Sequence, residues 1–198
     1  MLCLVSEIDR GRPDMARIEP LNKDELTDVQ KADWDRLVKQ GHLTNMQRTI
    51  IRDHETYVAY DAWHTSWNRL VEIVGLRAAT VFAHAISEIN ECQLCSLYFV
   101  ADLKKLGIQP QDFHETEEES ILVKLGREYV KDPTSIQDEV FDSLFKYWTA
   151  NEIIAIIGFA GQMVATNDFN SAIGINLDDR LLPLQPEFKP SNWRTRNK

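Results

Sequence analysis

Apolar residues recur at steps of three and four through most of this chain, and this spacing constrains the fold more strongly than any other feature. In residues 55–74 the aromatic and aliphatic side chains from Tyr57 to Val71 fall on one helical face. Residues 76–89 are apolar on most sides, which predicts a central buried helix. The same spacing predicts further helices at residues 24–40, 45–51, 92–106, 121–130, 135–148 and 151–165.

Polar residues, glycines and prolines mark the expected ends of the helices. Thr44 and Asn151 are suited to cap the helices that follow them, and Gly75 is expected to end the aromatic helix. The Ile pairs after Asn151 also suit a strand, but the flanking helical patterns and the lack of hairpin signals favour a helix. We therefore predict an all-α fold. The expected organisation is an N-terminal extension over residues 1–14, a helical domain over residues 15–182, and an extended Pro-rich tail over residues 183–198 that reaches a neighbouring subunit.

The composition excludes several classes of protein. Hydrophobic residues make up 43% of the 198 residues, enough for a sizeable core, and 8 Gly and 7 Pro are too few for a collagen-like chain. The formal net charge of −9 argues against binding nucleic acid, which depends on clustered Lys and Arg. We see no signal peptide, and the most apolar stretch, residues 153–164, is shorter than the roughly 20 residues of a membrane span. We expect a cytoplasmic protein without a membrane partner.

Cys92 and Cys95 form a C-x-x-C motif at the expected start of a central helix. The helix dipole and the free N–H groups there favour a thiolate, and two thiols at this spacing can close a disulfide. A structural zinc site needs two more cysteine or histidine ligands. The one other cysteine is Cys3, and the sequence contains no second C-x-x-C motif, so we expect no metal. A third interpretation is that both cysteines simply fill the core.

His84, Glu88 and Cys92 are spaced i, i+4 and i+8, with Cys95 one turn further on. If one helix runs through all four, an imidazole and a carboxylate face the dithiol and can relay protons to it. The alternative is that His84 is a hydrogen-bonded core residue and Glu88 a solvated charge. The choice between these two interpretations depends on Asn90 and Glu91, because a break in the helix there would turn the cysteines away from His84 and Glu88. The other histidines are interpreted as structural or surface residues.

Residues 76–107, with the core EINECQLC, resemble the carboxymuconolactone decarboxylase and alkylhydroperoxidase D-like family. Segments before and after this core resemble the family in the same order, and together they cover roughly nine-tenths of the chain. These segments begin at Met15, Met46, Glu119, Lys131 and Asn151. The resemblance implies an all-α, homo-oligomeric protein that uses no metal or organic cofactor.

The resemblance also implies roles for the cysteines. In the family's peroxidases the second cysteine of the motif attacks and the first resolves, which corresponds to Cys95 and Cys92 here. Those peroxidases carry a Glu twelve residues before the first cysteine and a His four residues after the second. This chain has Thr80 and Phe99 at those positions, so the family's proton relay is absent as such. His84 and Glu88 are the candidate substitutes.

The leading hypothesis is a thiol-dependent antioxidant oxidoreductase. It would cycle Cys92 and Cys95 between dithiol and disulfide to reduce a hydroperoxide or a disulfide, with electrons from an external thiol donor. We expect weak hydroperoxide turnover, because the relay residues are missing. The rival hypothesis is a non-enzymatic helical oligomer that binds a small apolar ligand or a protein partner.

Overall fold

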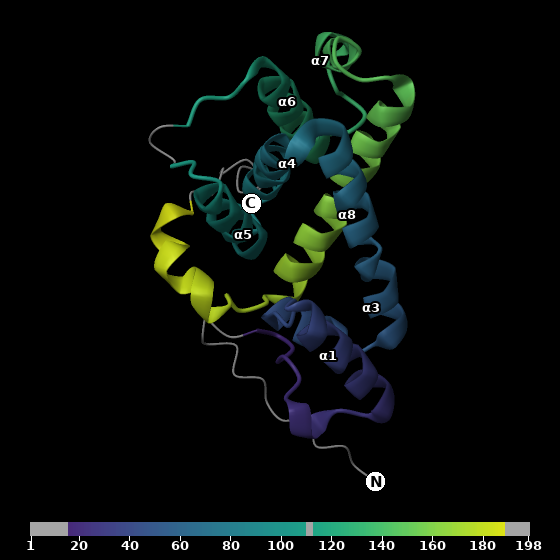
Figure 1. Cartoon of the computed structure of the whole chain (residues 1–198), viewed down its shortest axis with the longest axis vertical. Helices are drawn as coiled ribbons and strands as arrows, with labels where there is room; N and C mark the ends of the chain where they lie inside the picture. The colour runs from purple at the N-terminus through teal and green to yellow at the C-terminus, as the bar shows by residue number, and fades with distance from the viewer. Residues whose placement is uncertain (1–15, 110–112, 189–198) are drawn as a thin grey trace.

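The computed structural model describes residues 16–109 and 113–188 (Figure 1). These residues form helices and turns and contain no strand, which confirms the predicted all-α class. The expected extension of residues 1–14, with Cys3, lies outside the described residues. The elements are η1 (Lys23–Glu25), α1 (Asp28–Gln40), α2 (Asn45–Ile50), α3 (His54–Asp61), α4 (Trp63–Ile89), α5 (Gln93–Lys105), α6 (Glu117–Lys131), α7 (Asp138–Leu144), α8 (Ala150–Ile173) and η3 (Asp179–Glu187).

Helix α4 is the centre of the main core and packs against α5, α6 and α8. Phe82, Ile86 and Phe159 are fully buried there, as the apolar patterns of residues 76–89 and 151–165 predict. Gly126 lets α6 approach α4 closely, since a Cβ atom at this position would lie 2.9 Å from Cγ1 of Ile86. A smaller cluster around Trp34, Leu37 and Tyr57 holds α1, α2 and α3 together.

Several helix boundaries follow local side-chain chemistry. Thr44 accepts a hydrogen bond from the backbone N–H of Gln47, which confirms the predicted cap of α2. The cap of α8 is Thr149 rather than Asn151, because Thr149 and Glu152 form a reciprocal capping box. Gly75 breaks the helical geometry inside α4, with φ 80° and ψ 157°, so two helical segments meet there.

Two further predictions differ from the structure. The helix expected over residues 135–148 is shorter, and α7 spans Asp138–Leu144. The tail expected to be extended from residue 183 instead continues a 3-10 helix, η3, to Glu187. Leu181 is fully buried in η3, so this segment packs on its own chain, against α5. Residues 189–198 lie outside the described residues.

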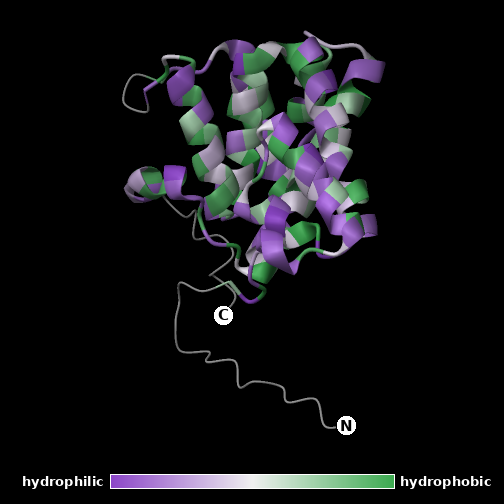
Figure 2. Cartoon of the chain, turned by 60° about the horizontal axis from the view of Figure 1, so that its bottom comes forward, coloured by the Kyte–Doolittle hydropathy of each residue, from purple (hydrophilic) through white to green (hydrophobic). Residues whose placement is uncertain are grey.

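Residues 54–89 are long and apolar enough to cross a membrane by length and composition alone. However, 56% of their most apolar window is buried inside the protein, as expected for a core helix. Apolar and polar residues are intermixed along the helices in Figure 2, which is typical of amphipathic helices that pack on one another.

Candidate functional site

The C-x-x-C motif lies where the chain leaves α4 and begins α5. Cys92 is the N-cap residue of α5, and Cys95 lies in the first turn of that helix. The prediction that the motif begins a helix is therefore confirmed. Glu91, immediately before it, has a φ of 58°, so α4 and α5 are separate helices with a sharp turn between them. The stripe expected from His84 to Cys95 on one continuous helix is wrong for this reason.

Both cysteines are free thiols and both are buried, with Cys92 2% exposed and Cys95 6% exposed. Helix α8 supplies the polar groups around them. The side-chain amide Nδ2 of Asn170 donates a hydrogen bond to Sγ of Cys95 at 3.1 Å. Hydrogen bonding by the side chains of Ser171 and Asn170 also lowers the pKa of Cys92. Asn170 is itself 3% exposed, and its Oδ1 atom has no hydrogen-bond partner among the described residues.

The two thiols differ in their acidity. A hydrogen bond from the Cys95 thiol lowers the pKa of Cys92, and the backbone N–H of Cys95 adds to this effect against the opposing effect of burial. The hydrogen bond to Cys92, together with burial, raises the pKa of Cys95 well above its ordinary value. This environment favours a thiolate on Cys92. The resemblance gives the attacking role to Cys95, so the local electrostatics favour the opposite order.

Thr80 and Phe99 occupy the positions of the family's relay residues. Thr80 is fully buried, and its Oγ1 donates a hydrogen bond to the carbonyl oxygen of Leu76 at 2.7 Å. Phe99 is buried and stacks on Trp67, with ring centroids 6.0 Å apart. Both side chains are therefore committed to the core of the protein, and neither can exchange protons with the dithiol.

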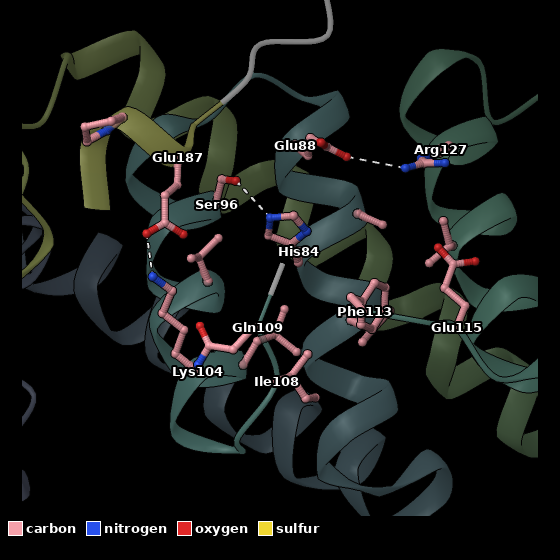
Figure 3. Close-up of a pocket in the computed structure, with 16 residues that line it drawn as sticks. His84, Glu88, Ser96, Lys104, Ile108, Gln109, Phe113, Glu115, Arg127 and Glu187 are labelled. Carbon is pink, nitrogen blue, oxygen red and sulfur yellow. Dashed lines mark hydrogen bonds and ion pairs between the residues drawn. The ribbon is translucent and has the colours of Figure 1, made fainter. Parts of the chain in front are cut away.

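His84 and Glu88 lie together in a different place. Figure 3 shows them among the side chains around a partly open cavity of about 590 Å³ lined by α4, α5, α6, η3 and the residues before α6. Nε2 of His84 lies 3.3 Å from Oγ of Ser96, and Glu88 forms an ion pair with Arg127 at 3.4 Å. Neither cysteine lines this cavity, and neither His84 nor Glu88 hydrogen-bonds to a sulfur within residues 16–109 and 113–188.

Burial lowers the pKa of His84, while the charge of Glu88 acts in the opposite direction. His84 is therefore a neutral imidazole at neutral pH. A second ion pair, between Lys104 and Glu187, lies on another side of the same cavity (Figure 3). Among the residues that the structure describes, no group of three or more His, Cys, Asp or Glu side chains is placed to hold a metal ion.

The sequence analysis missed Ser96, Asn170 and Ser171 as parts of these sites. A signal for Asn170 was present, because Asn167 and Asn170 are amides three residues apart near the end of a helix that is otherwise strongly apolar. Both asparagines are buried. Their meeting with the cysteines depends on how α8 packs, which the sequence pattern alone does not specify.

The sequence matches no protein-family model and no curated protein. Solved structures with a similar fold include the debrominase Bmp8 in its apo form, with a TM-score of 0.69 and 15% identity over 87% of this chain and 97% of that chain. A Cys-to-Ala variant of Bmp8 in complex with 2,3,4-tribromopyrrole gives a TM-score of 0.67 and 14% identity, with the same coverage. An uncharacterized peroxidase-related protein from Silicibacter sp. TM1040 gives 0.65 and 15% identity over 89% of this chain and 97% of that chain. The protein therefore has the alkylhydroperoxidase D-like helical fold.

Proposed function

We propose that the protein is a thiol oxidoreductase of the carboxymuconolactone decarboxylase and alkylhydroperoxidase D-like family. The observation that carries the proposal is the pair of hydrogen-bonded thiols of Cys92 and Cys95 at the N-terminal end of α5. A thiolate at such a position is both stabilised and nucleophilic. The fold shared with a peroxidase-related protein supports a peroxidase or a related reductase activity.

The pKa directions support Cys92, rather than Cys95, as the attacking thiolate of the proposed reaction. The Cys92 thiolate attacks the terminal oxygen of a hydroperoxide, the O–O bond breaks, and the leaving alkoxide takes a proton to become an alcohol. The Cys95 thiol then attacks the resulting Cys92 sulfenic acid, so that a disulfide forms and water leaves. Two molecules of an external thiol restore the dithiol and become a disulfide themselves. With a disulfide substrate, Cys92 forms a mixed disulfide that Cys95 resolves.

The proposal includes weak hydroperoxide turnover. Positioned acid and base groups contribute about 10² to 10⁴ in rate, and Thr80 and Phe99 supply neither. Asn170 donates a hydrogen bond to Sγ of Cys95 at 3.1 Å, but an amide does not titrate. Disulfide exchange, which needs less proton transfer to a poor leaving group, should therefore be faster than peroxide reduction.

Exposed apolar side chains support a homo-oligomer as part of the proposal. Ile154, on α8, is 73% exposed, and Phe145, just after α7, is 54% exposed. Burying such residues between subunits would remove apolar surface from water. Light scattering at micromolar concentration should give a mass above that of one 22.9 kDa chain, and a monomer would contradict the proposed assembly.

The test of the function is a thiol titration of the native protein before and after a mild oxidant. The proposal requires the free thiols of Cys92 and Cys95 to disappear together after the oxidant and to be restored by dithiothreitol. It also requires a reduction potential of about −270 to −200 mV, the range of thioredoxin and glutaredoxins. Thiols that stay inert would support the rival, a non-enzymatic protein that binds a ligand or a partner. A much lower potential would indicate a structural bond.

A further inference from the structure

The cavity beside His84 is separate from the dithiol, because neither sulfur lines it. Its volume of about 590 Å³ falls within the range of small-molecule sites. Val81, Val100, Leu103, Phe113 and Val123 give it apolar walls drawn from α4, α5, α6 and the segment before α6. These walls suit the apolar body of a small molecule.

Four of the five charged side chains around the cavity form two ion pairs, and the fifth, Glu115, is exposed to solvent, which screens its charge. Arg127 is paired with Glu88, and Lys104 is paired with Glu187 (Figure 3). A charged ligand would have to break one of these pairs or leave its own charge desolvated, and both are costly. This arrangement therefore favours a ligand without a net charge.

The inner polar groups favour a hydroxyl. His84 is held at Nε2 by the Ser96 hydroxyl, and its Nδ1 atom makes no hydrogen bond to the described residues. Depending on the tautomer, Nδ1 is either a donor or an acceptor, and a hydroxyl can serve both. Burial lowers the pKa of His84, so the ring stays neutral and does not attract an anion. The Oε2 atom of Glu187 is a second acceptor without a donor among the described residues.

We propose that this cavity binds a neutral small molecule with an aromatic or branched apolar body and a hydroxyl group that hydrogen-bonds to His84. The apolar walls hold the body, the paired charges exclude ions, and the imidazole orients the hydroxyl. The proposal goes beyond the redox function and does not depend on it, since the cavity and the thiols use different side chains.

The experiment is isothermal titration calorimetry at neutral pH with four probes of one shape. The probes are 4-tert-butylphenol, tert-butylbenzene, 4-tert-butylbenzoate and 4-tert-butylbenzylammonium. We expect the phenol to bind about tenfold more tightly than each of the others. Tert-butylbenzene lacks the hydrogen bond to His84, and each charged probe has to break an ion pair, and either loss changes the affinity by about that factor. Equal affinities for all four, or no binding of the phenol at millimolar concentration, would overturn the proposal.

Variants locate the site and separate it from the dithiol. Val100→Trp should fill the cavity and abolish phenol binding, whereas Val38→Trp, on the exposed surface of α1, should leave the affinity unchanged. His84→Phe keeps the bulk of the ring and should weaken the phenol about tenfold without affecting tert-butylbenzene. If Val100→Trp does not fold, as judged by circular dichroism, the His84→Phe comparison decides alone. Cys92→Ser should bind the phenol like the parent, and a loss of binding there would contradict the separation of the two sites.

Discussion

The dithiol and the His84 cavity use different side chains of α5, and they differ in how tightly they are enclosed and in the charges around them. The dithiol is tightly enclosed, with both sulfurs buried against Asn170 of α8. The cavity is roomy, and ion pairs and apolar walls from α4, α5, α6 and η3 surround it. The first arrangement suits chemistry on two sulfurs with a small reactant, and the second suits reversible binding of a larger molecule. Under the two proposals, residues that are close in sequence belong to two sites with different tasks.

The largest effect on activity should come from replacing each cysteine, one at a time, with serine. Both Cys92→Ser and Cys95→Ser should lose reductase turnover, because a disulfide needs both sulfurs. After treatment with a peroxide, a dimedone adduct should appear on Cys92 in the Cys95→Ser variant, since Cys92 has the more acidic thiol. Mass spectrometry locates the adduct. An adduct that forms instead on Cys95 in the Cys92→Ser variant would restore the order that the family resemblance implies.

Asn170→Leu should have the next largest effect. Leucine has a similar shape but cannot donate to the sulfurs. Cys95 loses the hydrogen bond at 3.1 Å, and the Cys92 thiolate loses one of the hydrogen bonds that lower its pKa, each a loss of about 0.5–1.5 kcal/mol. The rate of iodoacetamide alkylation, followed against pH, should show a higher thiol pKa and a slower reaction at neutral pH. Asn167→Leu, one turn earlier on α8, serves as the control, because Asn167 contacts Ser87 rather than a sulfur. Equal profiles for Asn170→Leu and the parent would remove Asn170 from the site.

The close approach of α6 to α4 predicts a contrast between two glycines. Gly126→Ala should destabilise the protein by about 1–3 kcal/mol, because the new methyl group overlaps Ile86. Gly158→Ala should stabilise it by about 0.8–1.0 kcal/mol, since that position is open and alanine favours helix. Urea denaturation measures both. If Gly126→Ala were as stable as Gly158→Ala, the packing that sets the α6 wall of the cavity would be looser than described.

The cavity should also make stability depend on pH. The pKa of His84 is lower in the folded protein than in the unfolded chain, so the stability that its neutral form provides is present above pH 6.5. This stability is lost as the pH falls below 6.5 and the unfolded chain takes up the proton first. His84→Phe should therefore show a smaller loss of stability between pH 7 and pH 5 in urea titrations. Burial also lowers the pKa of His64, so His64→Phe should change the pH dependence in the same direction. Identical pH profiles for the parent and His84→Phe would contradict the role given to His84.

The smallest effect is expected from Glu88→Gln. Because Glu88 is paired with Arg127 at the cavity, the change should alter thiol reactivity by no more than about twofold, the range of an ordinary surface substitution. Glu117→Gln, on exposed α6 surface, is the control. A large, selective loss of disulfide exchange in Glu88→Gln would show that Glu88 acts on the dithiol, and the dithiol and the cavity would then belong to one site.

Much of the fold was predictable because it depends on local patterns. The helices and the position of the C-x-x-C at a helix start follow from residue spacing and from Gly and Thr punctuation. The sequence located a possible break at Asn90 and Glu91 but did not decide whether it forms, because the break depends on a left-handed turn at Glu91, a residue type that rarely signals such a turn. The role of Asn170 was hidden because α8 meets the cysteines only through tertiary packing. The η3 helix was missed because its two prolines resemble those of an extended segment.

The segment around η3 has a consequence for the order in which the molecule is made. Asp178 accepts a hydrogen bond from the backbone N–H of Asn45 and another from the hydroxyl of Tyr98, and Glu187 pairs with Lys104. One stretch of chain thus ties α2 to α5 and also closes one side of the cavity. A ribosome synthesises this stretch after every helix that it fastens. The nascent protein can assemble its helices early, but it completes the cavity and locks its N-terminal cluster only when these late residues emerge.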